Sequence, residues 1–70
     1  MIMQNKTAER IKEVRLFNSL NQSEFGKSLC VSQDTISLWE NGKSLPSVDL
    51  IIKICKIYDI SADYLLGLLD

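Results

Sequence analysis

The sequence predicts an all-α fold of five short helices, and three observations support this prediction. Proline occurs once and glycine three times in 70 residues, so few positions break a helix. No run of β-branched residues alternates with polar ones, as a half-buried strand would. Four of the five expected helices follow a serine or an asparagine, which are residues that cap helix N-termini. We therefore expect a compact five-helix domain.

The first helix is predicted over residues 7–17, because Ile11 and Val14 give this stretch an apolar stripe. Arg10, Lys12 and Glu13 are expected to lie outside the stripe. We expect residues 1–6 to form an N-terminal tail and residues 7–70 to form one domain, since no linker or repeat interrupts the chain.

The second helix is predicted to begin at Gln22, because Asn21 and Glu24 have the spacing of a capping box. Phe25 and Leu29, four residues apart, would form its buried face. The helix would be short and end near residues 30–31.

Ser32 is expected to cap the third helix, and the pair Asn41-Gly42 is expected to end it. Ile36 and Trp39 are three residues apart and would face the core. The remaining side chains of this stretch are mostly polar. The residues expected to point outward are Gln33, Asp34, Thr35, Ser37 and Leu38.

The fourth helix is predicted over residues 48–58, with Ser47 as its cap, and Ser61 would cap a last short helix that Gly67 ends. The fourth helix is apolar on more than one face, so a second surface is expected to be covered by another chain. The stripe expected to face the monomer core consists of Val48, Ile51, Cys55 and Tyr58. The apolar residues left over include Leu45, Tyr64, Leu68 and Leu69.

Two short helices joined by a three-residue turn have helix-turn-helix spacing. Gly26 is small, as required where the two helices come close together. Amide and hydroxyl side chains on the outer face of the second of these helices are suited to reading base edges in the major groove.

The run from Leu20 to Ser47 resembles the lambda-repressor/Cro (Xre-type) helix-turn-helix DNA-binding domain, and the resemblance extends over about residues 8–67. The positions that match the pattern of this family are Gln22, Glu24, Leu29, Val31, Ser32, Thr35, Ile36, Ser37, Glu40, Asn41, Gly42, Pro46 and Ser47. Cys30 departs from the pattern, because the family prefers glycine in the turn, and a side chain in a left-handed conformation costs about 1–2 kcal/mol. Gly26 replaces the more common alanine.

The resemblance implies a role for individual residues. Bases would be read by Gln33, Asp34, Thr35, Ser37 and Leu38. DNA phosphates would be bound by Asn21, Gln22, Lys27, Ser32, Asn41, Lys43 and Ser44. Arg15 and Glu40 would form an ion pair between the first and third helices. A homodimer would form through Leu45, Ala62, Tyr64 and Leu68.

The function implied by the resemblance is a sequence-specific double-stranded DNA-binding transcriptional regulator of bacterial or phage origin, acting as a repressor and as a homodimer. The acidic pI of about 5.2 and the net charge of -1 are low for a DNA-binding protein, so the electrostatic share of binding would be small. The alternative is an antitoxin or adaptor-type interaction module with a protein partner and weak DNA binding.

An enzyme is not expected, because the sequence lacks histidine and offers no pairing of a nucleophile with a base. Neither a metal nor a cofactor is expected, since Cys30 and Cys55 stand far apart in the sequence. Two isolated cysteines without a leader or an apolar spanning segment predict buried thiols in a reducing cytoplasm, away from membranes.

Overall fold

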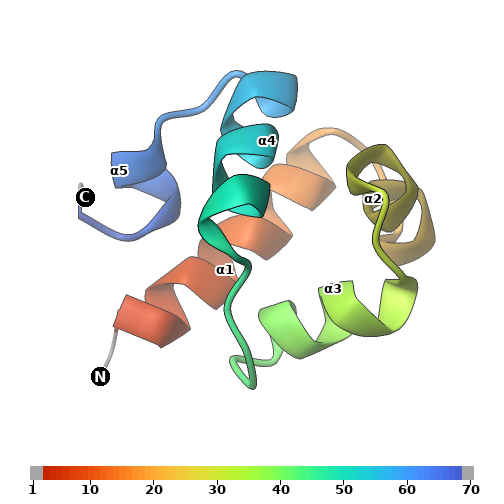
Figure 1. Ribbon diagram of the computed structural model, residues 1–70, viewed down its shortest axis with the longest axis horizontal. Helices are drawn as coiled ribbons and strands as arrows, with labels where there is room; N and C mark the ends of the chain where they lie inside the picture. The colour runs from red at the N-terminus through yellow and green to blue at the C-terminus, as the bar shows by residue number, and fades with distance from the viewer. Residues whose placement is uncertain (1–2, 69–70) are drawn as a thin grey trace.

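The computed structural model describes residues 3–68 (Figure 1). Its helices are α1 (Met3–Phe17), α2 (Gln22–Leu29), α3 (Gln33–Glu40), α4 (Val48–Tyr58) and α5 (Ala62–Leu65). No strand occurs within these residues, and they form a globule of 26 × 24 × 22 Å. The prediction of a compact all-α domain with five helices is confirmed.

Helix α1 begins at Met3, four residues before the start predicted from the sequence, so residues 3–6 are helical rather than a tail. Two physical reasons account for the longer helix. Residues 3–6 contain no glycine or proline, and Met, Gln and Lys favour helices. The aliphatic part of the Lys6 side chain also packs on Gly67, where a Cβ atom would lie within 2.3 Å of Lys6 Cγ.

The four predicted N-caps are all present. Asn21 and Glu24 form the full capping box of α2, and the hydroxyl groups of Ser32, Ser47 and Ser61 accept hydrogen bonds from the first turns of α3, α4 and α5. The last helix ends before Gly67, which has a φ of 79°. The caps and ends of α2 to α5 therefore follow directly from the sequence.

The core lies where all five helices meet. Helix α1 crosses the molecule and packs against α3 and α5, while α2 packs against α3 and α4, and α4 packs against α5 (Figure 1). Six side chains in the core have no exposed surface, and they come from every helix. They are Ile11, Phe25, Leu29, Ile36, Ile54 and Leu65. This core fixes the position of α3 on the surface.

The stripe predicted for α4 is partly wrong. Val48 is 74% exposed and Ile54 is fully buried, whereas the sequence had placed Val48 in the core and Ile54 outside it. Val48 is the first residue of the helix, and its side chain points towards the helix N-terminus, beyond the core. Ile54 lies one turn from buried Ile51 and so shares its face.

The cysteines also differ from the prediction. Cys30 is exposed and Cys55 is half-buried, so Cys30 is not the buried thiol expected. Cys30 is exposed because it occupies the turn between α2 and α3, where its backbone rather than its side chain packs on the domain. Burial raises the pKa of the Cys55 thiol, which makes it a poor nucleophile.

Residues 3–68 contain neither a membrane-spanning helix nor a cluster of metal ligands. None of the helices there combines the length and the apolar character needed to cross a membrane. Over the same residues, the acidic and thiol side chains form no group of three or more that could hold a metal ion.

Candidate nucleic-acid interface

The turn between α2 and α3 depends on one left-handed residue and on one close approach of the backbone. Cys30 has a left-handed conformation with a φ of 61°, and its N–H group donates to Lys27 O at 3.2 Å. The N–H group of Val31 donates to Gly26 O at 2.9 Å. A Cβ atom on Gly26 would lie only 2.7 Å from Val31 O, so glycine allows the turn to close tightly against α2.

The inner side of α3 is anchored by Ile36 and Trp39, which are buried in the core as predicted. The opposite side is turned to solvent. Gln33, Asp34 and Leu38 are exposed, and Thr35 and Ser37 are half-buried. The five residues predicted to read bases therefore lie on one short helix whose orientation the core determines.

Hydrogen bonds hold four of the polar side chains on or next to α3. The hydroxyl groups of Ser32 and Thr35 lie 3.0 Å apart, and the backbone N–H group of Thr35 donates to Ser32 Oγ at 3.1 Å. At the end of the helix, Nδ2 of the C-cap residue Asn41 donates to Ser37 Oγ at 3.2 Å. Gln33 and Asp34, in contrast, extend from the first turn of α3 into solvent.

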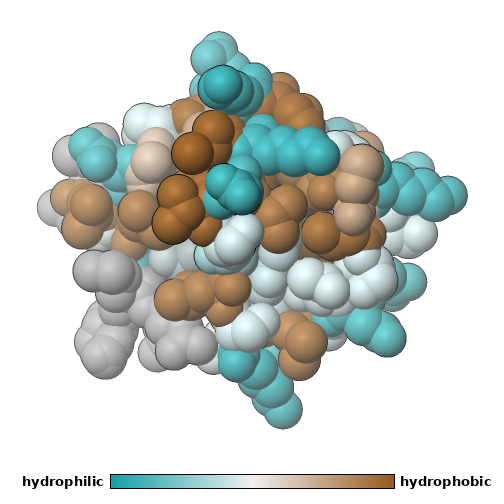
Figure 2. All heavy atoms as spheres, viewed as in Figure 1, coloured by the Kyte–Doolittle hydropathy of each residue, from teal (hydrophilic) through white to brown (hydrophobic). Residues whose placement is uncertain are grey.

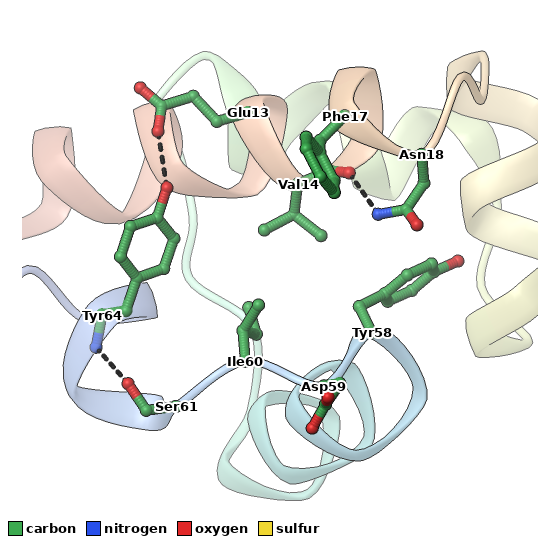
Figure 3. A pocket seen from close by; sticks show the side chains of 9 residues that line it. All are labelled: Glu13, Val14, Phe17, Asn18, Tyr58, Asp59, Ile60, Ser61 and Tyr64. Atoms are coloured by element: carbon green, nitrogen blue, oxygen red, sulfur yellow. Dashed lines mark hydrogen bonds between the residues drawn. The ribbon is translucent and has the colours of Figure 1, made fainter.

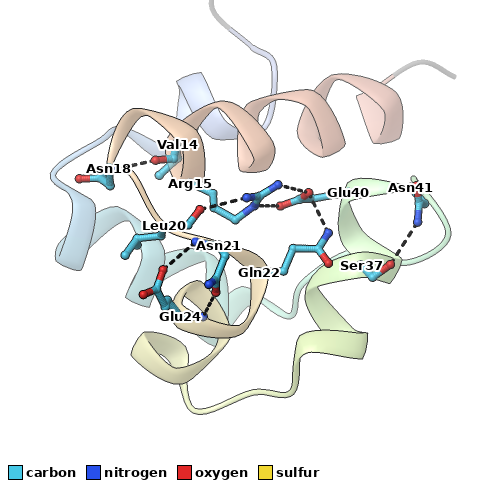
Figure 4. A network of polar contacts seen from close by, with 10 residues as sticks. All are labelled: Val14, Arg15, Asn18, Leu20, Asn21, Gln22, Glu24, Ser37, Glu40 and Asn41. Carbon is cyan, nitrogen blue, oxygen red and sulfur yellow. Dashed lines mark hydrogen bonds and ion pairs between the residues drawn. The ribbon is translucent and has the colours of Figure 1, made fainter.

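A polar network connects α3 to α1 and α2 (Figure 4). Arg15 Nε donates to Glu40 Oε2 at 2.7 Å, and Arg15 Nη2 donates to Glu40 Oε1 at 3.0 Å. Arg15 Nη1 also donates to Leu20 O at 3.0 Å. The hydrogen bond to Glu40 raises the pKa of Arg15, while partial burial opposes this change. Such bidentate pairing fixes the geometry of both side chains.

Gln22 joins this network, because its Nε2 donates to Glu40 Oε1 at 3.1 Å. The residue predicted to bind a phosphate is thus held at the first position of α2 by the carboxylate that pairs with Arg15. An amide nitrogen carries two N–H groups, so one of them is still available to a ligand. The N-terminus of α2, with its free backbone N–H groups, favours an anion beside it.

The other predicted phosphate ligands differ in their surroundings. The side chain of Asn21 already forms part of the N-cap of α2, since its Oδ1 accepts from Glu24 N at 2.7 Å. Lys27, Ser32 and Lys43 are exposed, whereas Ser44 is half-buried. Asn41 is exposed and bonded to the end of α3 through Ser37.

The charge near α3 is modest. Lys27 and Lys43 flank the helix in sequence, and Asp34 is the charged residue on its outer side. Three exposed acids, Asp49, Asp59 and Asp63, belong to α4, α5 or the connection between them. A single copy of this surface offers few cations to DNA phosphates, which limits the electrostatic part of its affinity.

The residues predicted for a dimer do not form one uniform surface. Leu45, Ala62 and Leu68 are exposed, and Leu69 lies outside the described residues. Tyr64 is half-buried, because its hydroxyl group donates to Glu13 Oε1 at 2.7 Å and its ring lies 4.2 Å from Arg10 Cζ. The structure therefore leaves only part of Tyr64 available for a contact.

Arg10 was missed as a structural residue. The sequence had placed it off the apolar stripe of α1, yet it is buried, and its Nη1 donates to Tyr64 O at 2.7 Å. Its position four residues before Val14 could have indicated that it shares the inner face. The partner on α5, more than fifty residues away, could not be found from sequence spacing.

Comparison with known proteins agrees with this geometry. A family model described as helix-turn-helix matches residues 11–65. The chain is 33% identical over 59 residues to the HTH-type transcriptional activator BcrR of Enterococcus faecalis, covering 84% of this chain and 29% of that protein. It is 32% identical over 59 residues to the HTH-type transcriptional regulator ImmR of Bacillus subtilis, covering 84% of this chain and 46% of that protein.

A third relative, the antitoxin PezA of Streptococcus pneumoniae, is 36% identical over 53 residues, which cover 76% of this chain and 34% of that protein. The chain thus spans less than half the length of these three relatives. No solved structure matches the chain significantly. The family consists of DNA-binding domains of transcription regulators and is not a class of enzyme. From its fold, its turn and these matches, the chain belongs to the Xre-type helix-turn-helix family.

Proposed function

We propose that the chain is a sequence-specific transcriptional regulator of bacterial or phage origin, which binds double-stranded DNA as a homodimer in the cytoplasm and acts as a repressor. One observation carries the proposal: the core holds α3 rigidly by Ile36 and Trp39 while its polar side is turned to solvent. A short helix presented in this way fits the major groove, where base edges carry a distinct pattern of donors and acceptors.

Within this proposal, the first turn of α3 reads the bases. Gln33 is exposed at its first position and could form paired hydrogen bonds to the N6 and N7 atoms of adenine. Asp34 would accept from the N4 group of cytosine, and Leu38 would contact a thymine methyl group. Thr35 and Ser37 complete the base-reading set.

The phosphate contacts would fix the position of α3 in the groove. Gln22 is the strongest candidate, because Glu40 already orients its amide and the start of α2 favours an anion. The remaining phosphate ligands of this proposal are Asn21, Lys27, Ser32, Asn41, Lys43 and Ser44.

The small number of lysines beside α3 favours a homodimer, since a second, linked DNA-binding domain raises affinity through its effective concentration. The two recognition helices would enter successive major grooves with half-sites about 34 Å apart. The proposed contact comprises Leu45, Ala62, Tyr64 and Leu68. Val48 and Ile52 are also exposed, and they lie one turn apart on α4. Apolar side chains gather over α4 on the face seen in Figure 2.

The base-reading role is tested by comparing two glutamines. A site is first selected from a random double-stranded library, and binding curves are then measured on single-base variants of that site. Gln33→Ala should lower specific affinity by about 1–3 kcal/mol and relax the preference at one base pair. Gln22→Ala should weaken all variants equally, because a phosphate carries no sequence information. Equal losses on every variant for Gln33→Ala would contradict base reading by this residue.

The dimer is tested by sedimentation at micromolar concentration, with Val48→Ser as the disrupting change and exposed Leu16→Ser as its control. A monomer that still binds a single half-site would refute the dimer. A promoter-reporter fusion then tests repression against activation, since one relative is named as an activator.

An antitoxin or adaptor-type module is the second candidate, and the similarity to PezA supports it. Absence of any selected DNA site would favour this candidate. It would then act through a protein partner rather than through DNA.

A further inference from the structure

An open groove of about 610 Å³ lies between the C-terminal half of α1 and the connection from α4 to α5 (Figure 3). Val14 and Phe17 of α1 line one side of it, and Tyr58 and Ile60 line the other. Tyr64 closes one end through its hydrogen bond to Glu13. We refer to this space as the α1 groove. Its walls are predominantly apolar, so it suits an apolar side chain.

The exposure of Phe17 has no explanation within the domain. It is 90% exposed, whereas neighbouring Val14 is buried in the core. Burying a phenylalanine side chain contributes about 1.5–3 kcal/mol of free energy. The described residues of the domain leave Phe17 almost fully exposed, so this contribution is not realised in the single chain. A ligand seated in the groove beside Phe17 would bury it without any change in the core.

The charge of the groove restricts the ligand. Glu13 and Asp59 are exposed on its two sides, and no lysine or arginine is among the described residues that line it. A ligand with basic side chains next to an apolar one complements this arrangement. A second copy of the same groove would instead bring two more acids against Glu13 and Asp59, which disfavours self-association here.

The groove is separate from the surface assigned to DNA. None of the residues proposed to contact bases or phosphates lines it, and the proposed dimer contact shares only Tyr64 with it. In Figure 1, the connection from α4 to α5 lies at the upper edge of the molecule and α3 lies at the lower right. The groove could therefore hold a ligand while α3 is bound to DNA.

We propose that the α1 groove binds a short segment of a partner protein that places one large apolar side chain beside Phe17 and carries lysine or arginine on either side of it. The apolar walls and exposed Phe17 select the anchor, and Glu13 and Asp59 select the basic flanks. The inference does not depend on the DNA-binding proposal, since it uses a different set of side chains.

The probe for this proposal is a random twelve-residue peptide library displayed on phage and selected on the whole purified chain. Counter-selection on Phe17→Ser removes peptides that bind elsewhere. Phe17 is exposed, so this change should leave the fold intact, which the thermal unfolding midpoint verifies. Enriched peptides are expected to combine a leucine, isoleucine or aromatic residue with neighbouring lysine or arginine. Synthetic copies are then titrated against variants.

Two pairs of variants separate the apolar from the charged contribution. Phe17→Ser should weaken the selected peptide about tenfold, as expected for loss of an anchor contact. Leu16→Ser, which removes an exposed apolar neighbour outside the groove, should have no effect. Glu13→Gln combined with Asp59→Asn should weaken binding about threefold at low salt and hardly at all at high salt. Glu9→Gln combined with Asp49→Asn removes the same charge elsewhere and should change nothing.

The choice of substitutions preserves the local structure. Glutamine at position 13 still accepts from Tyr64, and asparagine tolerates the left-handed backbone of Asp59, whose φ is 56°. DNA affinity should be unchanged in all groove variants, so failure of one proposal is distinguishable from failure of the other.

Three results would overturn the proposal: no enriched peptide, an acidic consensus, or unchanged affinity of the selected peptide for Phe17→Ser. Sedimentation of Phe17→Ser decides the remaining alternative. If the native chain is dimeric and this change alone produces monomers, the groove is occupied by a second copy, and the partner-segment proposal is wrong.

Discussion

Arg15 and Glu40 face each other as two parallel forks, with nitrogen–oxygen distances of 2.7 and 3.0 Å, and they join the end of α1 to the end of α3. Their side chains are only 10% and 5% exposed. Because Glu40 also accepts from Gln22, one carboxylate connects three helices. The orientation of α3 relative to the start of α2 therefore depends on a charge pair as well as on the apolar core.

Replacing Glu40 by Gln should lower the free energy of unfolding by about 3 kcal/mol, because it leaves the charge of Arg15 buried without its partner. Urea denaturation followed by circular dichroism measures the change, with exposed Glu9→Gln as the control. An unchanged denaturation midpoint would show that the pair acts only as a surface contact.

Gly26→Ala changes helix propensity and packing, and the two changes have opposite effects on stability. Propensity alone predicts a gain of about 0.5–1 kcal/mol, since glycine weakens a helix interior. The new Cβ atom would, however, lie 2.7 Å from Val31 O in the turn. We expect a net loss of about 1–3 kcal/mol, the usual cost of forcing extra atoms into a packed site. Thermal unfolding tests this, with Lys27→Ala on the exposed side of the same helix as the control. A higher stability of Gly26→Ala would contradict the close approach.

Cys30→Gly should stabilise the domain by about 1 kcal/mol, because glycine adopts a φ of 61° without the steric cost of a side chain. Cys30→Ala keeps the Cβ atom and also removes the thiol, so it separates the backbone effect from the chemistry of sulfur. Denaturation of both variants under reducing conditions is the measurement. Equal stabilities of the two variants would argue against strain at this position.

Stability should fall as the pH rises above about 10, and Tyr64 should contribute to this fall. The hydrogen bond to Glu13 raises the pKa of Tyr64 above its ordinary value of 10.0, with burial and the charge of Glu13 acting in the same direction, while Arg10 opposes them. The unfolded chain therefore releases this proton at a lower pH than the folded chain. The contribution is complete below the unfolded pKa and is lost as the pH rises through the folded pKa.

Tyr64→Phe removes that titration. At pH 8 the variant should be about 0.5 kcal/mol less stable than the native chain, because it lacks one exposed hydrogen bond. The difference should shrink as the pH rises beyond 10, which urea midpoints at several pH values would reveal. A difference that stays constant up to pH 11 would show that the pKa of Tyr64 is the same in the folded and the unfolded chain.

The helices and caps could be predicted because they depend on neighbours in sequence. Ser32 and Ser47 act on N–H groups three residues away, and the inward face of α3 follows from the spacing of Ile36 and Trp39. The left-handed conformation of Cys30 was implied by the resemblance, because the family prefers glycine at this position of the turn.

Other features depend on distant parts of the chain. Helix α1 begins early because Lys6 packs on Gly67. Arg10 is buried because its guanidinium group donates a hydrogen bond to the carbonyl group of Tyr64 in α5. For Val48 and Ile54, apolar periodicity could not decide which face of an almost wholly apolar helix meets the core. The α1 groove was not anticipated either, because its two sides come from segments about forty residues apart.

The packing of Lys6 on Gly67 also means that the order of the helices along the chain could be changed without moving them in space. It places the first turn of α1 beside the segment that follows α5, and Figure 1 shows the start of α1 and α5 on the left of the view, with α3 at the lower right. A short flexible linker could join residue 68 to residue 3, and the chain could be reopened in the connection between α3 and α4, where Lys43 is exposed. Such a circular permutant would keep every helix while reversing the order in which α4 and α1 are synthesised. The same proximity means that segments attached before residue 3 and after residue 68 would emerge at one place, away from α3.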